Sequence, residues 1–443
     1  MMTTPICDFV KEYSKNNFAR MHMPGHKGKS FLGFEAFDIT EINGADSLFD
    51  AKGIIAESEK NASEIFKCNT FYSTEGSSLC LRAMIYLLKL WDKNIKILAG
   101  RNAHKTFITA AALTDTDIEW LYPKEDQGYL SGKITAETIE NVIKQNNGRK
   151  LAVYLTSPDY LGNIADIKAI SLVCKKFGVL LCVDNAHGAY LKFMPESLHP
   201  IDLGADLCCD SAHKTLPVVT GGAYLHISPS APEFFGSNAK SALSLFASTS
   251  PSYLILQSLD NANAYISNEL PKKLLEFTNN MKIVRSKIIK MGYTLTGDEL
   301  LKLVFKAKDF GYYGFELASI LENNGIFCEF YDKDYLVLML SSETTESEIE
   351  KTLEVLANIP QKRPIIEKVP EITNPERVVS LKEAIFSKTV TLPINQCLGK
   401  IAAEFNISCP PAVPILVCGE RIDQKAIDCF EYYGIDNCKV IEV

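Results

Sequence analysis

The run VLLCVDNAH, residues 179–187, indicates the fold class of this chain. It is a short apolar stretch that ends in the carboxylate of Asp184 and the imidazole of His187, as a buried strand does when it delivers polar groups at its end. Similar runs alternate with apolar helical stretches such as SSLCLRAMIYLLKLW (77–91); they are KILAG (96–100), LAVYLT (151–156) and AYLHI (223–227). This alternation predicts an α/β fold with a largely parallel sheet that helices cover on both faces.

The carboxyl ends of these strands are the expected place for a functional site. Ligands of open α/β sheets bind in the crevice beyond those ends. Ser157 directly follows the run 151–156, Asp184 ends the run 179–184, and His187 lies three residues further on. We therefore expect these three side chains at one edge of the sheet.

Lys214, in the string SAHK (211–214), is the candidate reactive residue. It follows the strand-like GADLCCDS and precedes LPVVTGG, so we expect it at a strand end. A lysine that carries a cofactor as a Schiff base needs a partner that tunes the cofactor, and a carboxylate beside a pyridine nitrogen is such a partner. Asp184 can fill that role, and the pair predicts a pyridoxal phosphate enzyme. The alternatives are a surface lysine in a turn, an aspartate that caps the next helix, and, for His187, a hydrogen-bonded core histidine.

Donors for a phosphate group are expected on two segments. The string TEGSS (74–78) precedes a hydrophobic helix, and helix N-termini attract phosphate through unpaired amides and the helix dipole. The second segment is the one that carries the lysine. The candidate donors are Gly76, Ser77, Ser78, Ser211 and His213. An ordinary serine cap is the alternative for the first segment. His104, in RNAHKT (101–106), is a candidate flat ring to stack on the cofactor, and a turn histidine is its alternative.

Composition excludes several other classes of protein. The 443 residues are 47% hydrophobic and 23% charged, which allows two or three domains with real cores. The net charge of -8 gives no basic field for nucleic acid, and the 13 cysteines include no CxxC pair, which favours a reducing compartment. No secretory leader or apolar stretch of membrane-spanning length is present, so we expect a cytoplasmic protein.

Two motifs near the N-terminus resemble a nucleotide-binding loop and a metal site but lack features that those sites require. The string GKS (28–30) resembles the end of a nucleotide-binding P-loop, but Met23 stands where the first glycine is required. His22 and His26 have the spacing of metal ligands, yet the proline and glycine between them preclude a regular helix. We expect no metal site.

The pattern along the chain predicts four regions. These are an N-terminal arm (1–50), a large cofactor-binding domain (51–270), a small α/β domain (271–362) and a C-terminal α+β domain (363–443). A long helical stretch near 251–290 leads into the small domain. The proline-containing segment QKRPIIEKVPEITNPE (361–376) predicts a linker, and a helix is expected near 381–404.

Nine short motifs, in order along nearly the whole chain, resemble the pyridoxal phosphate-dependent Orn/Lys/Arg decarboxylase family of fold type I. They are MPGHKG (23–28), GADSLF (44–49), GSS (76–78), RNAHKT (101–106), SP..LG (157–162), VDNAHGA (183–189), SAHKT (211–215), STSPSY (248–253) and PP..PILV.GE (410–420). A single SxHK would be a weak signal, whereas nine motifs in family order are a strong one. The resemblance is to the short bacterial form.

The resemblance implies a role for each candidate residue. Lys214 would be the Schiff-base lysine, Asp184 the partner of the pyridine nitrogen, and His104 the residue stacked on the ring. The five phosphate candidates keep that role, and His187 would line the side of the ring. Thr249 or Ser250 would reach the phosphate of the neighbouring subunit, which implies an obligate homodimer with shared sites. Glu329 would lie near the distal cation of the substrate.

The implied reaction is decarboxylation of lysine, arginine or ornithine to the corresponding amine, which would feed polyamine metabolism. Four positions depart from the family pattern: Asn185 replaces a usual glutamate, Asp159 a small hydroxyl residue, Ala412 a glycine and Cys418 a proline. None of them removes a catalytic group, but Asp159 and Asn185 are expected near the substrate pocket. The alternatives are an aminotransferase or β-eliminating lyase on the same cofactor, or a non-catalytic homologue that acts as a binding protein.

Overall fold

The computed structural model describes residues 2–123, 128–371, 374–403 and 412–442. The chain divides into two compact units, each built from separate segments. The first unit comprises Met1–Ile95, Ala152–Tyr154 and Ile167–Leu275, and the second comprises Lys96–Leu151, Leu155–Asp166 and Glu276–Val443.

Seven strands form the large sheet, in the order β1-β7-β6-β5-β4-β2-β3. Strands β5 and β6 are parallel, as are β2 and β3, whereas β7 is antiparallel to both of its neighbours, β6 and β1. The α/β fold with a largely parallel sheet is thus confirmed. The strands are β1 (Asn69–Ser73), β2 (Lys96–Gly100), β3 (Asp117–Leu121), β4 (Leu151–Thr156), β5 (Leu180–Asp184), β6 (Leu207–Asp210) and β7 (Ala223–Ile227).

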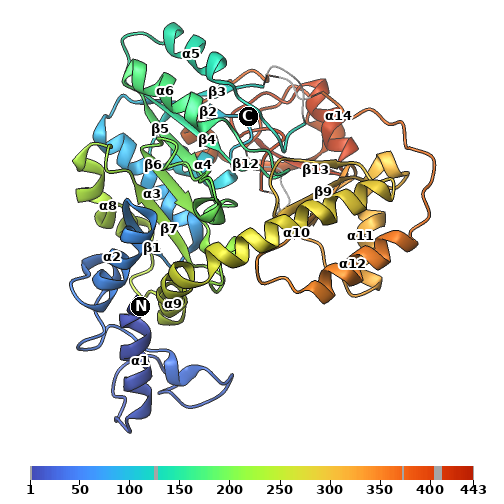
Figure 1. The fold of residues 1–443 in the computed structure, drawn as a ribbon. Helices are drawn as coiled ribbons and strands as arrows, with labels where there is room; N and C mark the ends of the chain where they lie inside the picture. Colours follow the sequence, from blue (N-terminus) through green and yellow to red (C-terminus); the bar gives the residue numbers. More distant parts are fainter. Residues whose placement is uncertain (1, 124–127, 372–373, 404–411, 443) are drawn as a thin grey trace. The chain divides into compact units, whose positions relative to one another are not determined.

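Helices of the first unit pack on its strands through apolar faces, and α3 and α8 lie side by side along the sheet (Figure 1). Helix α3 buries eight hydrophobic side chains, among them Leu79, Met84 and Leu88, because its apolar residues recur at helical spacing. The helices are α1 (Pro5–Lys15), α2 (Ile54–Phe66), α3 (Gly76–Trp91), α6 (Ile167–Phe177), α7 (Ala212–Thr215), α8 (Glu233–Phe246) and α9 (Tyr253–Asn268). Within the described ranges, no helix is both long enough and apolar enough to cross a membrane.

The N-terminal arm contains a regular helix, α1, where the sequence pattern predicted none. Pro5 stands at the start of α1, where its fixed φ suits the first turn, and Ile6, Cys7 and Val10 form a buried stripe. The Cys7 amide donates to the Asp260 carboxylate of α9 at 2.9 Å, so the arm is fixed to the first unit.

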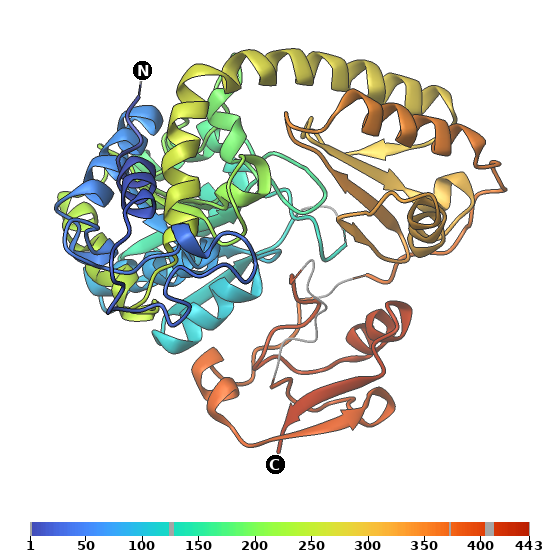
Figure 2. The same cartoon turned by 90° about the horizontal axis from the view of Figure 1, so that it is seen from below.

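The second unit contains a small four-stranded antiparallel sheet in the order β10-β11-β9-β8. Figure 2 shows α12 and the C-terminal part of α10 together over one face of this sheet. Its strands are β8 (Leu295–Thr296), β9 (Lys302–Lys306), β10 (Phe330–Tyr331) and β11 (Tyr335–Met339). Before its C-terminal region, the described helices of this unit are α4 (Lys105–Leu113), α5 (Ala136–Gln145), α10 (Leu270–Lys290, which begins in the first unit), α11 (Gly314–Asn323) and α12 (Glu346–Asn358).

The C-terminal region corrects one prediction. The helix expected near 381–404 is limited to α13 (Leu381–Phe386), and strand β12 (Thr389–Pro393) follows it. The β-branched residues Thr389, Val390 and Thr391 favour an extended backbone, and β12 pairs in antiparallel register with β13 (Asn437–Ile441). Helix α14 (Gln424–Tyr432) completes the described part of this region, and Pro410 and Pro411 of the last motif lie outside the described residues.

Candidate active site

Lys214 lies in α7, the short helix that directly follows β6. Its Nζ is 2.9 Å from Nε2 of His187, which lies in the turn after β5. Because β5 and β6 are parallel neighbours, their carboxyl ends meet at one edge of the sheet and bring the two side chains together. The expected position of Lys214 at a strand end is confirmed.

Asp184 is the last residue of β5 and is 3% exposed. Its Oδ1 accepts from the Ala186 amide at 3.1 Å, and its Oδ2 accepts from the Tyr154 hydroxyl at 3.2 Å. Burial raises the pKa of this carboxyl, while the Ala186 amide and the charge of Lys214 act in the opposite direction. A buried carboxylate beside a lysine is thus held at the strand end. Tyr154 was not among the predicted site residues.

Two of the phosphate candidates come together. Ser211 Oγ donates to Ser77 Oγ at 2.8 Å, so the segment before Lys214 meets the first turn of α3. Gly76 starts α3 with φ of +69°, a left-handed conformation that glycine adopts without penalty, and its amide donates to the Gly221 carbonyl at 2.7 Å. Ser78 lies in the same turn. The start of α3 and the residues before Lys214 therefore form one polar surface.

The ring of His213 faces the backbone. Its Nδ1 donates to the Gly222 carbonyl at 3.0 Å, because a carbonyl oxygen only accepts. Burial lowers the pKa of His213, and the neighbouring Lys214 charge lowers it further. The neutral ring then presents an unprotonated Nε2, so His213 could donate to a phosphate only as the imidazolium, which a dianion would favour.

Thr249 and Ser250 lie on the exposed connection between α8 and α9. The Ser248 amide donates to the Glu75 carboxylate at 2.7 Å, and Ser248 Oγ accepts from the Ser250 amide. This connection therefore lies beside the start of α3 of the same chain. Its predicted reach into a neighbouring subunit stays a prediction.

His104 and Glu329 belong to the second unit. His104 is the N-cap of α4, and its Nδ1 accepts from the Thr106 amide at 3.1 Å. Glu329 precedes β10 and is exposed, and its Oε1 accepts from the Tyr160 hydroxyl at 3.2 Å. Their predicted roles towards the cofactor and the substrate stay predictions.

A buried charge network that was not predicted from the sequence surrounds Asp210, the last residue of β6. Asp210 Oδ2 accepts from Nε2 of His199 at 3.0 Å and from Nε2 of His226 at 3.2 Å, and all three side chains are fully buried. Burial would raise the pKa of Asp210, but the two imidazoles hold it far below its ordinary value. Burial would likewise lower the pKa of His226, but Cys68 and Asp210 raise it overall. Asp210 directly precedes Ser211, so this network supports the segment that carries Lys214.

The sequence matches the family model of the Orn/Lys/Arg decarboxylase major domain over residues 4–305, and that of the C-terminal domain over residues 366–436. The chain belongs to the Orn/Lys/Arg decarboxylase family. It is therefore a decarboxylase, and membership implies pyridoxal phosphate as its cofactor.

Relatives of this decarboxylase span nearly its whole length. It is 28% identical to the uncharacterized protein YaaO of Bacillus subtilis (strain 168), over 96% of this chain and 93% of that protein. It is 27% identical to the arginine decarboxylase of the same organism, over 96% and 92%. Among solved structures, the lysine decarboxylase LdcF of Francisella novicida superposes with a TM-score of 0.82 at 18% identity, covering 100% of this chain and 81% of that one. This superposition supports the type I fold.

The residues of the first unit fit pyridoxal phosphate. Lys214 could supply an amine for covalent attachment, with an imidazole 2.9 Å away. Asp184 could place a buried carboxylate at a pyridine nitrogen, and the Ser77–Ser211 pair together with the first turn of α3 could supply donors for a phosphate.

Asn185, where the decarboxylase family commonly has glutamate, is explained by the charge network. Its Nδ2 donates to Asp210 Oδ1 at 2.7 Å, and the residue is fully buried. A glutamate here would place a second carboxylate against Asp210, which like-charge repulsion disfavours. The amide of Asn185 is thus turned to Asp210.

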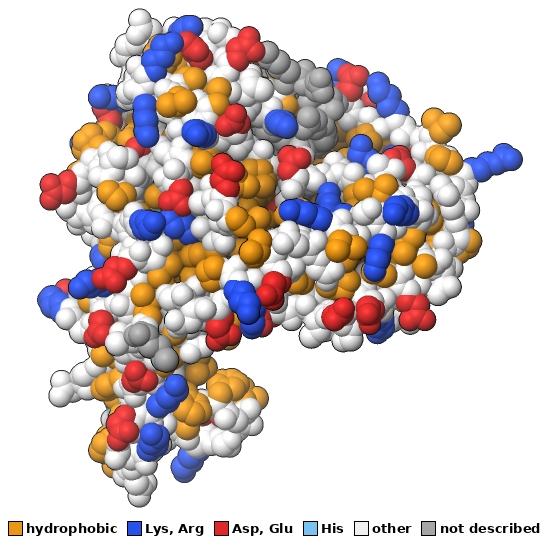
Figure 3. Space-filling view, in the orientation of Figure 1, with side chains coloured by type: hydrophobic (Ala, Val, Ile, Leu, Met, Phe, Trp, Pro, Cys, Tyr) orange, Lys and Arg blue, Asp and Glu red, His pale blue; other side chains and the backbone are white. Residues whose placement is uncertain are grey.

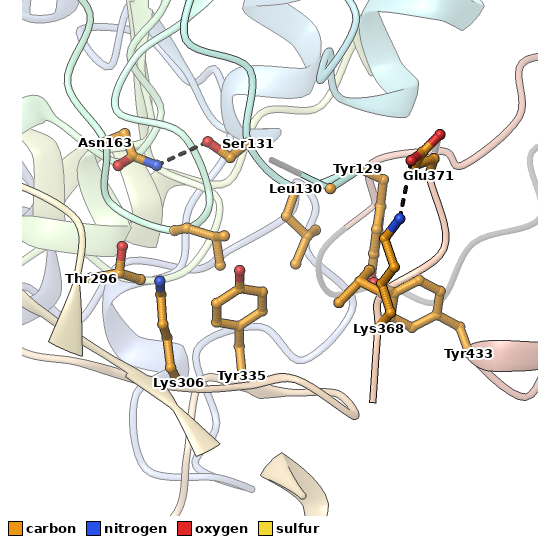
Figure 4. A pocket seen from close by; sticks show the side chains of 13 residues that line it. Tyr129, Leu130, Ser131, Asn163, Thr296, Lys306, Tyr335, Lys368, Glu371 and Tyr433 are labelled. Atoms are coloured by element: carbon orange, nitrogen blue, oxygen red, sulfur yellow. Dashed lines mark hydrogen bonds and ion pairs between the residues drawn. The ribbon is translucent and has the colours of Figure 1, made fainter. Parts of the chain in front are cut away.

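Asp159, the second departure from the family pattern, is also satisfied within the protein. Its Oδ2 accepts from Ser131 Oγ at 2.8 Å, and both of its oxygens accept from the Asn163 amide. Burial raises the pKa of this carboxyl, and these donors counteract the rise. Figure 4 shows the Ser131–Asn163 pair on the wall of a cavity of about 520 Å³ in the second unit, with Lys306 and Tyr335 on another side. The carboxylate that we expected near the substrate is engaged by these two residues.

Ala412 stands where the decarboxylase family commonly has glycine, and its φ is +56°. A left-handed residue with a Cβ costs about 1–2 kcal/mol, whereas glycine adopts this conformation freely.

Cys418 is fully buried, and burial raises the pKa of its thiol to about 12, so it is a neutral apolar side chain at physiological pH.

Ala412→Gly is expected to stabilise the protein by up to about 1 kcal/mol. Relief of the left-handed strain exceeds the extra chain entropy that glycine gives the unfolded state. The shift in the thermal unfolding midpoint measures the effect. Ala403→Gly, at a buried alanine of the same region without positive φ, is the control and should lower the midpoint. A lower midpoint for both variants would contradict the argument.

Proposed function

We propose that this protein decarboxylates a basic amino acid, with arginine as the first candidate, to the corresponding amine, with pyridoxal phosphate bound at Lys214. The observation that carries the proposal is the Lys214–His187 pair beside the buried carboxylate of Asp184 at the ends of β5 and β6. Relatives named arginine decarboxylase, 26–28% identical over at least 94% of this chain, support arginine. Lysine and ornithine are the other candidates.

Each residue of the cluster has a defined task in this proposal. Lys214 would hold the cofactor covalently through its Nζ. His187 can take and return a proton at Nζ, to which its Nε2 is 2.9 Å away. Asp184 would keep a proton on the ring nitrogen, and pyridoxal phosphate, when bound, would supply an electron sink for decarboxylation. Gly76, Ser77, Ser78, Ser211 and His213 bind the phosphate, and His104 stacks on the ring.

Recognition of the substrate's distal cation is assigned to Glu329. Its carboxylate is exposed, and the Tyr160 hydroxyl donates to one of its oxygens. A carboxylate pairs with a guanidinium in bidentate fashion, or with an ammonium as a point charge, so Glu329 suits all three substrates. The product would be agmatine or a diamine, the kind of amine that feeds polyamine metabolism.

A homodimer with shared sites in the cytoplasm is part of the proposal. The N-terminal segment exposes large hydrophobic side chains, and Figure 3 shows hydrophobic patches on its surface. The most exposed of them are Met21, Met23, Phe31 and Leu32, at 63–91% of their full accessibility. A group of this kind marks an interaction surface. We assign it to a second copy of the chain, whose Thr249 or Ser250 would reach the phosphate.

The test is incubation of the pyridoxal phosphate-loaded protein with arginine, lysine and ornithine in one mixture. We expect carbon dioxide release and one dominant amine by mass spectrometry. Transfer of the amino group to an oxo acid without gas would instead identify an aminotransferase, and loss of a β-substituent a β-eliminating lyase. Cofactor binding without any of these reactions would favour the binding-protein alternative.

A further inference from the structure

A buried ion pair joins two residues of the sequence motifs, Arg101 and Glu420, to which the proposed mechanism gives no role. Arg101, the first residue of RNAHKT, places its Nη2 3.0 Å from Oε2 of Glu420, the last residue of the C-terminal motif. The side chains of Arg101 and Glu420 are 8% and 3% exposed, so both charged groups are shielded from solvent. They are 319 residues apart in the chain.

The hydrogen bonds around this pair complete a clamp, by which we mean Arg101, Glu420 and the backbone between Ala412 and Val417. Arg101 Nη1 donates to the Pro414 carbonyl at 3.2 Å, and Nη2 donates to the Ile415 carbonyl at 3.1 Å. The Val417 amide donates to Glu420 Oε2 at 2.7 Å. Breaking a buried pair on one side leaves an uncompensated charge, so the clamp has one well-defined arrangement.

Hydrogen bonds of the clamp and of the neighbouring strand β3 fix the backbone on both sides of His104. Three residues earlier, the Arg101 amide donates to the Leu121 carbonyl at 3.1 Å. One residue later, the Lys105 amide, the first of α4, donates to the Ala412 carbonyl at 2.8 Å. His104 itself caps α4, because its Nδ1 accepts from the Thr106 amide. That bond leaves Nε2 protonated in the neutral ring and fixes the plane of the imidazole.

We propose that Arg101 and Glu420 are positioning residues that hold the His104 ring in the orientation needed to stack on the cofactor. The C-terminal domain then contributes to cofactor binding through His104. The inference rests on the stacking role of His104 in the proposed function. An imidazole that two anchored segments hold in place loses little conformational freedom when the cofactor binds, which is the advantage of preorganisation.

A double-mutant cycle between Glu420→Gln and His104→Ala tests the proposal. Pyridoxal phosphate is titrated into the apo form of the full chain, and its dissociation constant is followed by visible absorbance and by circular dichroism of the bound cofactor. Ring stacking corresponds to about a three- to tenfold effect on affinity, so His104→Ala should weaken binding by that factor. Glu420→Gln should weaken it by a similar or smaller factor and alter the dichroism, and should add no weakening in the His104→Ala background.

Two further variants keep the test decisive. Arg101→Lys retains the charge but loses the guanidinium fork. If Glu420→Gln does not fold, Arg101→Lys replaces it in the test and should show the same loss of affinity and change in dichroism. Glu376→Gln removes the exposed ion pair with Arg421 in the same region and should leave cofactor affinity unchanged.

The possible results separate this inference from the function on which it rests. Equal weakening by Glu420→Gln in both backgrounds, or folded clamp variants with unchanged affinity and dichroism, would overturn the positioning role alone. Unchanged affinity and dichroism for His104→Ala would overturn both the stacking role and this inference. Carbon dioxide release by the unmodified protein would still support the proposed reaction.

Discussion

Lys214→Ala is expected to reduce carbon dioxide release by about 10³-fold or more and to remove the visible absorbance of the lysine-bound cofactor. Loss of a residue that forms a covalent bond during turnover has effects of this order or larger. The variant should fold, because the side chain of Lys214, in the short helix after β6, is only partly buried. Rates with arginine, lysine and ornithine, together with an absorbance spectrum, provide the measurement.

Lys60→Ala is the matched control for this variant, because Lys60 is an exposed lysine on α2 of the same unit. It should retain both the rate and the spectrum. Turnover by Lys214→Ala at an undiminished rate would refute the assignment of the reactive lysine. A variant that loses the absorbance but keeps its role in the cell would favour the binding-protein alternative.

Local pattern was sufficient for most of the large sheet. The predicted runs 96–100, 151–156 and 223–227 coincide with β2, β4 and β7, because each is a short apolar stretch bounded by polar residues or glycine. The helix expected near 381–404 was wrong for a non-local reason. Strand β12 is stabilised by pairing with β13, whose residues 437–441 lie far along the chain. The local sequence pattern of β12 does not indicate such a distant partner.

The residues of the candidate site likewise fall into those that the sequence could predict and those that it could not. Asp184, His187 and Lys214 could be predicted because each stands at or just beyond the end of a recognisable strand, and parallel strands bring such ends together. Tyr154 and His226 could not be predicted because they lie inside apolar strands, where only the fold shows which carboxylate they face. For Asn185 and Asp159, sequence marked a departure from the family, and the structure supplied the partners that account for it.

Asp210→Asn is expected to lower the free energy of unfolding by about 3–5 kcal/mol, because it leaves the buried His226 without its counter-charge. The pH dependence follows from the two pKa shifts. The pKa of Asp210 is lowered from 3.8, so its contribution to stability is present above that pH and is lost as the pH falls. The pKa of His226 is raised from 6.5, so its contribution is present below that pH and is lost as the pH rises through the raised value.

The difference in stability between the unmodified protein and Asp210→Asn should therefore be largest between about pH 4 and pH 6.5 and should shrink on either side. Urea unfolding midpoints at pH 5, 7 and 9 measure this difference. Asp50→Asn, which removes an exposed ion pair with Lys52 in the same unit, should shift the midpoints little at every pH. A difference below about 1 kcal/mol at pH 5 would mean that the network is held by neutral hydrogen bonds. A large difference confined to that pH range would identify a buried ion network as the support of the segment that carries Lys214.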